Sequence, residues 1–257
     1  RCDDSRSLGD WQVNQEKLKG GLPYLVEQVK ALGMQFGIWF EPEMISPDSR
    51  LYREHPDWIL SVPGRKVSVG RNQYVLDFSR EEVVNAIFEQ MKKVLTEAPI
   101  SYIKWDMNRS MSEVYSAGAG AKDQGKVMHK YILGVYRLYD MLTKEFPEIL
   151  FESCASGGAR FDPGLLYYAP QCWTSDDTDA VERCKIQYGT SFVYPVSSMG
   201  AHVSAVPNHQ LLRNTSLETR ANVAYFGTFG YELDPNRLTE EEKEEVKAQI
   251  TFMKQYR

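Results

Sequence analysis

Short strand-like runs alternate with amphipathic helical segments along this chain, and that alternation limits its fold more than any single motif. Regular alternation of this kind produces a parallel sheet, because each helix carries the chain back to the start of the next strand. Right-handed crossovers then leave two architectures, an open doubly wound sheet and a closed barrel. The six runs that read as strands are residues 36–40, 102–106, 149–154, 171–174, 196–199 and 228–233.

The absence of a phosphate-binding fingerprint favours the barrel. No GxGxxG or GxxxxGK motif follows any of these runs, as a nucleotide-binding open sheet would require. Six strands are two fewer than a (β/α)8 TIM barrel contains. The chain also opens on a polar segment without a methionine, so we expect that something precedes it. We therefore predict an α/β chain in which residues 1–257 form part of one barrel domain, with strands 3 to 8 present and strands 1 and 2 upstream of Arg1.

Several helices carry boundary signals. Gly33 follows a segment with helical spacing and is well placed to end it. Ser79 with Glu82, and Thr239 with Glu242, each have the spacing of a capping box at a helix start. In the long helix before Pro147, we expect one apolar face formed by Met128, Ile132, Val135 and Leu142.

Composition excludes several classes of protein. The chain has 257 residues, 42% hydrophobic and 25% charged, which suits a large domain with a substantial core. A net charge of -5 without a basic run predicts no nucleic-acid partner, and no apolar stretch approaches the roughly 18 residues of a membrane span. The cysteines show neither zinc-site spacing nor the density of a disulfide scaffold, which predicts free thiols in a reducing compartment. They are Cys2, Cys154, Cys172 and Cys184.

The segment from Tyr102 to Arg109 joins the end of a strand to a cluster of charge centred on Asp106. Alternation along the strand places Lys104, Asp106 and Asn108 on one face, at the strand end where barrel enzymes hold their chemistry. A second acidic cluster, residues 173–179, follows another short apolar run. Two carboxylates on one rim indicate glycoside hydrolysis.

Five blocks of the sequence resemble bacterial α-galactosidases of glycoside hydrolase family 36. The resemblance covers essentially the whole chain, and the order and spacing of the blocks make it specific. The blocks are Phe40-Glu-Pro-Glu-Met44, Lys104-Trp-Asp-Met-Asn-Arg109, Phe151-Glu-Ser-Cys154, Ser175-Asp-Asp-Thr-Asp179 and Met199-Gly-Ala-His-Val203.

The resemblance implies roles for particular residues. Asp106 would be the nucleophile at the end of the fourth barrel strand, and Asp176 the acid/base after the sixth. The family also carries an aspartate pair on its second strand, which grips galactose and would lie upstream of Arg1; Asp3 and Asp4 are not that pair. The substrate-binding residues implied are Trp39 against the sugar, Arg71 and Lys104 on hydroxyls, Asn108 beside the nucleophile, and Cys154 and Gly157 around the 2-position.

The chemistry assigns the two carboxyl groups opposite protonation states. In a retaining reaction one carboxylate attacks the anomeric carbon while a protonated carboxyl donates to the leaving oxygen, and the two groups lie roughly 5–5.5 Å apart. Lys104, on the same strand face as Asp106, would favour the ionised nucleophile. Asp176 must instead hold a proton, which burial and the charge of Asp106 would favour.

Each of these residues also has a structural interpretation. Asp106 could pair with Lys104 or Arg109, and residues 175–179 could cap a helix, with Asp177 and Asp179 bracing Asp176. Trp39 could be a core or rim aromatic, Arg71 a solvated loop residue and Cys154 a small buried hydrophobe. The histidines lack metal-ligand spacing, and we take His202 and His209 either as structural or as residues that support the site from behind; no metal or cofactor is predicted.

Three alternative functions remain open from the sequence. The acidic residues could bind magnesium for phosphoryl transfer, although no phosphate cradle is visible. The chain could be an inactive sugar-binding fragment, because a barrel lacking two strands has open edges. Within the family, it could act on α-linked N-acetylgalactosamine or transfer galactose as raffinose and stachyose synthases do. The resemblance predicts a small galactoside substrate of the melibiose or raffinose type, a cytoplasmic location, and a homo-oligomeric parent with flanking β-domains, which by the family pattern is a tetramer.

Overall fold

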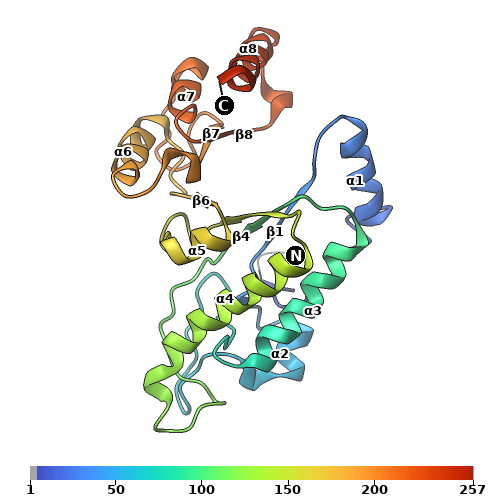
Figure 1. Cartoon of the computed structure of the whole chain (residues 1–257), viewed down its shortest axis with the longest axis vertical. Helices are drawn as coiled ribbons and strands as arrows, with labels where there is room; N and C mark the ends of the chain where they lie inside the picture. Colours follow the sequence, from blue (N-terminus) through green and yellow to red (C-terminus); the bar gives the residue numbers. More distant parts are fainter. Residues whose placement is uncertain (1–4, 257) are drawn as a thin grey trace. The chain divides into compact units, whose positions relative to one another are not determined.

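The computed structural model describes residues 5–256, so Cys2, Asp3 and Asp4 lie outside the described residues. The chain divides into two compact units, residues 1–155 and 156–257. Each unit is built from parallel strands joined by helices, as the alternation in the sequence predicts (Figure 1).

The first unit holds three parallel strands in the order β1, β4, β5. They are β1 (Gly37–Phe40), β4 (Tyr102–Trp105) and β5 (Leu150–Ser153). Trp39 pairs with Lys104, which pairs in turn with Glu152. The helices are α1 (Gly21–Ala31), α2 (Arg50–Glu54), α3 (Glu81–Glu97) and α4 (Val127–Glu145), with single 3-10 turns at Pro56–Trp58 and Gln124–Lys126.

The core of the first unit lies between the sheet and the helix pair α3 and α4, which run side by side (Figure 1). Ile103 and Trp105, two residues apart on β4, are both fully buried. The Trp105 ring stacks on Tyr139 of α4 with centroids 4.0 Å apart. Gly134 allows α4 to approach closely, because a Cβ there would lie 1.9 Å from the carbonyl oxygen of Phe78.

The second unit holds three further parallel strands in the order β6, β7, β8. They are β6 (Gln171–Trp173), β7 (Met199–Ser204) and β8 (Thr228–Glu232). Its helices are α5 (Pro163–Tyr168), α6 (Ala180–Ser191), α7 (Leu217–Ala224) and α8 (Glu240–Tyr256), with 3-10 turns at Val196–Ser198 and Pro235–Arg237. Ala201 and Val203 of β7 pack with Leu217, Ala221 and Ala224 of α7 to form its core.

Most of the predicted elements are present, and the structure differs from the prediction in several details. The run 196–199 is a 3-10 turn followed by β7, since the chain leaves Pro195 and becomes extended only at Met199. The connection between β1 and α3 also contains a short antiparallel pair, β2 (Met44–Ile45) and β3 (Tyr74–Val75), that was not predicted. The buried face of α4 is shifted, because Tyr131 and Tyr139 occupy the core while Met128 is 39% exposed.

The two predicted capping boxes differ in outcome. At α8, the Glu242 backbone N–H donates to Thr239 Oγ1 at 3.2 Å, and the Thr239 N–H donates to Glu242 Oε2 at 2.9 Å, so this box is confirmed. At α3 the prediction is wrong, because the N-cap is Arg80 and makes no side-chain cap. The Ser79 hydroxyl donates instead to the Asp77 carboxylate in the preceding turn.

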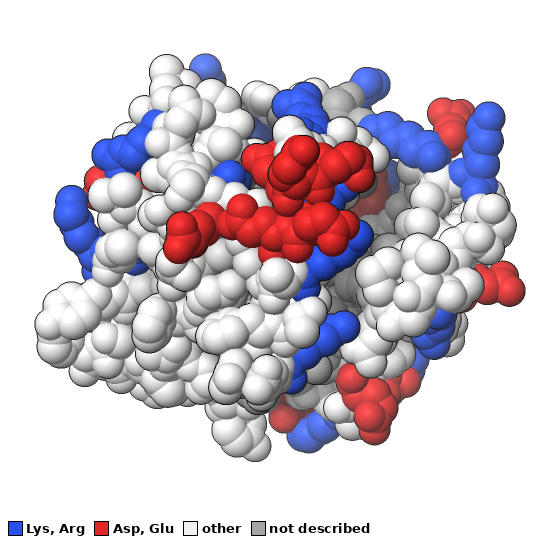
Figure 2. Space-filling view, turned by 90° about the horizontal axis from the view of Figure 1, so that it is seen from above, with Lys and Arg blue, Asp and Glu red and all other residues white. Residues whose placement is uncertain are grey.

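On the face shown in Figure 2, lysine and arginine side chains are scattered among other residues, whereas several acidic side chains gather in one group.

Among the described residues, no helix is long and apolar enough to cross a membrane.

Candidate active site

Asp106 begins the turn that leaves β4 and is 8% exposed. Its backbone N–H donates to the carbonyl of Phe40 at 2.8 Å, which extends the pairing with β1 by one residue. Its Oδ2 accepts hydrogen bonds from the Trp39 indole at 3.1 Å and from the Asn108 amide. Its Oδ1 accepts the Met107 N–H at 2.9 Å. Three donors therefore fix the orientation of this carboxylate.

Lys104 points from the same strand but has a different acidic neighbour. Its ammonium nitrogen lies 3.3 Å from Glu152 Oε1 on β5. Glu152 is 2% exposed and its other oxygen accepts the Tyr102 hydroxyl. Burial beside Glu152 raises the pKa of Tyr102 far above its usual value, so the phenol remains a donor. The sequence analysis gave Glu152 no role, because this side chain becomes a neighbour of Lys104 only when β4 and β5 pair in register.

Trp39, Cys154 and Arg71 differ in their burial and in their contacts. Trp39 is half-buried, bonds Asp106 directly and packs edge-on against Trp11 with ring centroids 6.2 Å apart. Cys154 is 4% exposed and follows β5, where its N–H donates to the carbonyl of Trp105 at 2.7 Å. Arg71 lies exposed in a loop with φ of 50°, and no hydrogen bond or ion pair of its side chain occurs within residues 5–256. The structure thus brings Trp39, Lys104 and Asn108 around β4 but leaves Arg71 in solvent.

Two fully buried glutamates follow β1, and the sequence analysis assigned neither a role. Glu41 Oε1 accepts the Asn108 backbone N–H at 2.9 Å, and Glu43 Oε1 accepts the Trp105 indole N–H at 2.8 Å. Buried carboxylates are costly unless hydrogen-bonded, so an acid repeated directly after an apolar strand was a usable signal. The sequence could not show that the two side chains face different parts of the unit.

Asp176 lies exposed in the loop between β6 and α6 of the second unit, so the expectation that this carboxyl group is buried is wrong. Gly157, in the same unit, has φ of +82°, a conformation that L side chains rarely adopt. A Cβ on Gly157 would lie 2.8 Å from Ser175 Cα and 2.9 Å from the Asp176 nitrogen. Gly158 is equally close, since its Cβ would lie 2.6 Å from the carbonyl oxygen of Thr174. The two glycines therefore let their loop pack directly on the backbone that carries Asp176.

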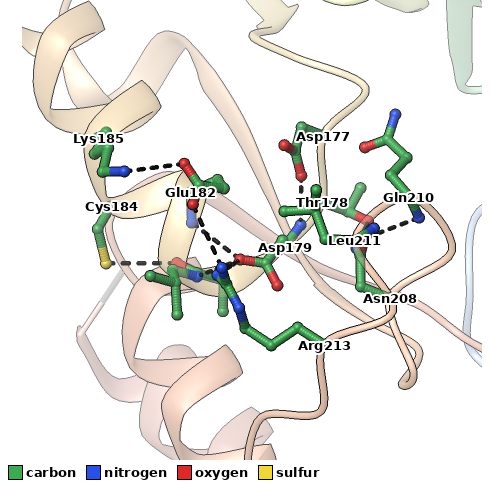
Figure 3. A network of polar contacts seen from close by, with 12 residues as sticks. Asp177, Thr178, Asp179, Glu182, Cys184, Lys185, Asn208, Gln210, Leu211 and Arg213 are labelled. Atoms are coloured by element: carbon green, nitrogen blue, oxygen red, sulfur yellow. Dashed lines mark hydrogen bonds and ion pairs between the residues drawn. The ribbon is translucent and has the colours of Figure 1, made fainter.

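The acidic residues after Asp176 form a structural network (Figure 3). Asp177 Oδ1 accepts the Asp179 N–H at 3.0 Å. Asp179 caps α6 by accepting the N–H groups of Val181 and Glu182, and pairs with Arg213 at 2.5 Å. The predicted capping role of this segment is confirmed for Asp179, while Asp177 braces it.

The β7–α7 loop holds the same segment from a second direction. Asn208 Nδ2 donates to Thr178 Oγ1 at 3.2 Å, and Ser204 Oγ donates to the Thr178 carbonyl at 2.9 Å. Asn208 Oδ1 also accepts the N–H groups of Gln210 and Leu211, which shapes the loop itself (Figure 3).

Arg183 lies buried behind the Asp176 loop, at 2% exposure. Its guanidinium stacks over Trp173 at 4.4 Å, donates to Thr174 Oγ1 and donates to the Gly200 carbonyl at 3.0 Å. Burial lowers the pKa of Arg183 to about 10, against the opposing effect of nearby acids that include Asp176.

The two histidines considered in the sequence analysis differ in their surroundings. His202 Nδ1 lies 3.3 Å from Glu232 and its ring packs against Trp173, whereas His209 is exposed. Within the described part of the chain, no three His, Cys, Asp or Glu side chains gather closely enough to hold a metal ion.

A family model described as Melibiase matches residues 1–257. This chain belongs to the Melibiase family. Alpha-galactosidase AgaA of Geobacillus stearothermophilus is 61% identical over 257 residues, and Alpha-galactosidase Mel36A of Lactobacillus acidophilus is 52% identical over 257 residues. Each alignment covers 100% of this chain but 35% of the relative, so the Melibiase chain spans about a third of the length of these proteins.

Solved structures agree with the family assignment. The crystal structure of the GH36 α-galactosidase AgaA matches this Melibiase chain with a TM-score of 0.97 and 61% identity, over 98% of this chain and 35% of AgaA. AgaA variants in complex with raffinose and with stachyose match equally well, each with a TM-score of 0.97 at 60% identity over 99% of this chain and 36% of AgaA. The predicted resemblance to family 36 and the predicted fold class, an incomplete (β/α)8 barrel, are therefore confirmed.

Proposed function

We propose that this chain provides the catalytic residues of a retaining α-galactosidase, which releases terminal α-linked galactose from oligosaccharides of the melibiose and raffinose type. The observation that carries the proposal is the Asp106 carboxylate, held at the end of a parallel strand by Trp39, Asn108 and the Met107 N–H. A nucleophile oriented before substrate binds needs little reorganisation during attack.

The reaction would proceed by double displacement. Asp106 attacks the anomeric carbon and forms a β-linked galactosyl-enzyme, while Asp176 donates a proton to the leaving oxygen. Asp176 then removes a proton from water, which attacks the same carbon and releases galactose with its α configuration.

The relatives support this assignment. In the AgaA complexes with raffinose and stachyose, two different aspartates are substituted, one by asparagine and one by alanine. Their separation along AgaA equals that between Asp176 and Asp106 here. Membership of the Melibiase family also favours glycoside hydrolysis over phosphoryl transfer, which a magnesium site would have served.

The substrate-binding roles are proposed on the same basis. Trp39 and Asn108 contact the nucleophile and so lie where a sugar would sit, and Lys104 is available beside Glu152 to bind a hydroxyl. Cys154 and Gly157 would shape the pocket around the 2-position, and Arg71 would reach the sugar from its exposed loop. We propose further that residues 1–257 are part of one catalytic barrel domain in a longer, tetrameric, cytoplasmic enzyme with flanking β-domains.

Azide rescue in the complete protein tests both catalytic roles. We expect Asp106→Gly to lose turnover of p-nitrophenyl α-galactoside and to regain it with azide, giving β-galactosyl azide by a single inversion. Asp176→Gly should accumulate the galactosyl-enzyme and, with azide, give α-galactosyl azide by two inversions. Asp123→Gly, which removes an exposed carboxylate from another loop, is the matched control and should retain the parent rate. An inactive parent, or an Asp106→Gly variant at the parent rate, would refute the proposal.

A further inference from the structure

Glu41 and Glu43 are separated by one proline, and both are 0% exposed. A carboxylate removed from water is expensive, and only well-placed hydrogen bonds compensate for that cost. Both residues accept at least two such bonds, but from different partners.

Glu41 is bonded to the turn that carries the proposed nucleophile. Its Oε1 accepts the Asn108 backbone N–H at 2.9 Å, and its Oε2 accepts the Gln73 side-chain amide at 3.2 Å. The carbonyl of Phe40, the residue before it, accepts the Asp106 N–H at 2.8 Å. Phe40 and Glu41 therefore hold the segment after β4 at two points, the backbone N–H of Asp106 and that of Asn108.

This anchoring reaches the Asp106 carboxylate through one side chain. Asn108 donates its Nδ2 to Asp106 Oδ2, so the position of the Asn108 backbone determines where that donor lies. The Asn108 N–H lies beyond the end of β4 and donates to the buried Glu41 carboxylate, and a bond to a carboxylate is stronger than one to a neutral group.

We propose that Glu41 is a positioning residue for the nucleophile: its buried carboxylate fixes the Asn108 backbone and thereby aims the Asn108 amide at Asp106. The contact that links Glu41 to the Asp106 carboxylate runs through Asn108. This inference rests on the proposed role of Asp106.

Glu43 supplies a matched control within the same motif. It accepts the Trp105 indole at 2.8 Å and the Tyr131 hydroxyl at 2.5 Å. Both donors belong to the packing between β4 and α4, on the side of the strand away from Lys104 and Asp106. Glu43 is as buried as Glu41 and as well bonded, yet it holds the core rather than the turn.

The test compares Glu41→Gln with Glu43→Gln in the complete protein, using p-nitrophenyl α-galactoside well below both melting temperatures. We expect Glu41→Gln to lower kcat about tenfold or more, with KM changed less than threefold and Tm close to that of the parent. Glu43→Gln should lower Tm while kcat stays within twofold. If Glu41→Gln keeps kcat within twofold, or if both variants lose kcat equally, the inference is wrong.

A double variant separates positioning from a need for the acid itself. In Glu41→Gln alone, an amide whose oxygen accepts the Asn108 N–H turns its nitrogen toward the Gln73 amide nitrogen, so two donors face each other and the side chain is displaced. Combining Glu41→Gln with Gln73→Glu supplies an acceptor for that nitrogen, so the carbonyl oxygen at position 41 can stay on the Asn108 N–H. We expect kcat within about threefold of the parent. A folded double variant that stays tenfold or more below the parent overturns the inference, and this variant decides the question if Glu41→Gln alone does not fold. An inactive parent would instead refute the proposed function, so the two failures are distinguishable.

Discussion

At the scale of single residues, Gly157 is the position where one added methyl group has the clearest structural consequence. Gly157→Ala would force an L side chain into φ of +82° and press its Cβ to 2.8 Å from Ser175 Cα and 2.9 Å from the Asp176 nitrogen. We expect a loss of about 1–3 kcal/mol in the free energy of unfolding. We also expect at least a tenfold loss of kcat/KM, because the Asp176 backbone must shift.

Chemical denaturation and steady-state kinetics on the complete protein measure the two effects. Gly189→Ala is the control, since this glycine lies in α6 with nothing within 4 Å of an added Cβ. It should leave activity unchanged and raise stability by up to about 1 kcal/mol. A Gly157→Ala variant as stable and as active as the parent would contradict the close approach.

At the scale of elements, α6 depends on one carboxylate for both its cap and its ion pair. Asp179, with a side chain 1% exposed, accepts two N–H groups at the helix start and pairs with Arg213 from the β7–α7 loop (Figure 3). We expect Asp179→Ala to cost about 3 kcal/mol or more, because it removes a cap and a largely buried ion-pair partner together. Arg213→Ala should cost less, since the Asp179 carboxylate keeps its two N–H donors.

Equilibrium unfolding of both single variants and the double variant measures the coupling between the two side chains. Ser216→Ala is the control because Ser216 caps α7 through the Thr219 N–H without an ion pair, and its loss should cost about 1 kcal/mol. If Asp179→Ala costs no more than Ser216→Ala, the ion pair contributes nothing to this junction.

The elements also show which structural features the sequence could predict. Strand and helix periodicity identified β1, β4, β5, β6 and β8, because alternation and helical spacing are local properties. The Thr239–Glu242 box was predictable for the same reason, whereas at Ser79 a competing bond to Asp77 prevailed over the same spacing. Local pattern thus identifies a potential cap but does not exclude a competing partner.

The site contacts required information that lies far apart along the chain. The sequence placed Lys104 near Asp106, but the structure adds Glu152, which becomes its neighbour only when β4 and β5 pair in register. Glu41 likewise meets Asn108 across two paired strands. The family resemblance predicted the identities of the site residues, whereas the buried acids that hold them follow from tertiary packing.

At the scale of the whole molecule, a group of exposed aromatic side chains on α6 and after α7 predicts association of the 257-residue chain. Tyr188, Phe192 and Phe226 are 68%, 72% and 68% exposed. Tyr188 and Phe226 line an apolar cavity of about 370 Å³, and Phe192 packs edge-on against Tyr188 with ring centroids 4.9 Å apart. Exposed apolar surface of this kind promotes contacts between molecules.

We therefore expect the chain expressed alone to self-associate at micromolar concentration and to bind a hydrophobic dye, as measured by light scattering after size-exclusion chromatography and by fluorescence. Replacing Tyr188, Phe192 and Phe226 with serine should reduce both signals, because it removes the aromatic side chains that lie together around this cavity. Serine at Tyr24 and Tyr167, which are 55% and 82% exposed on other helices, is the control and should leave association unchanged. The prediction is wrong if the chain stays monomeric and binds no dye. It is also wrong if the control substitutions at Tyr24 and Tyr167, and not those at Tyr188, Phe192 and Phe226, reduce association.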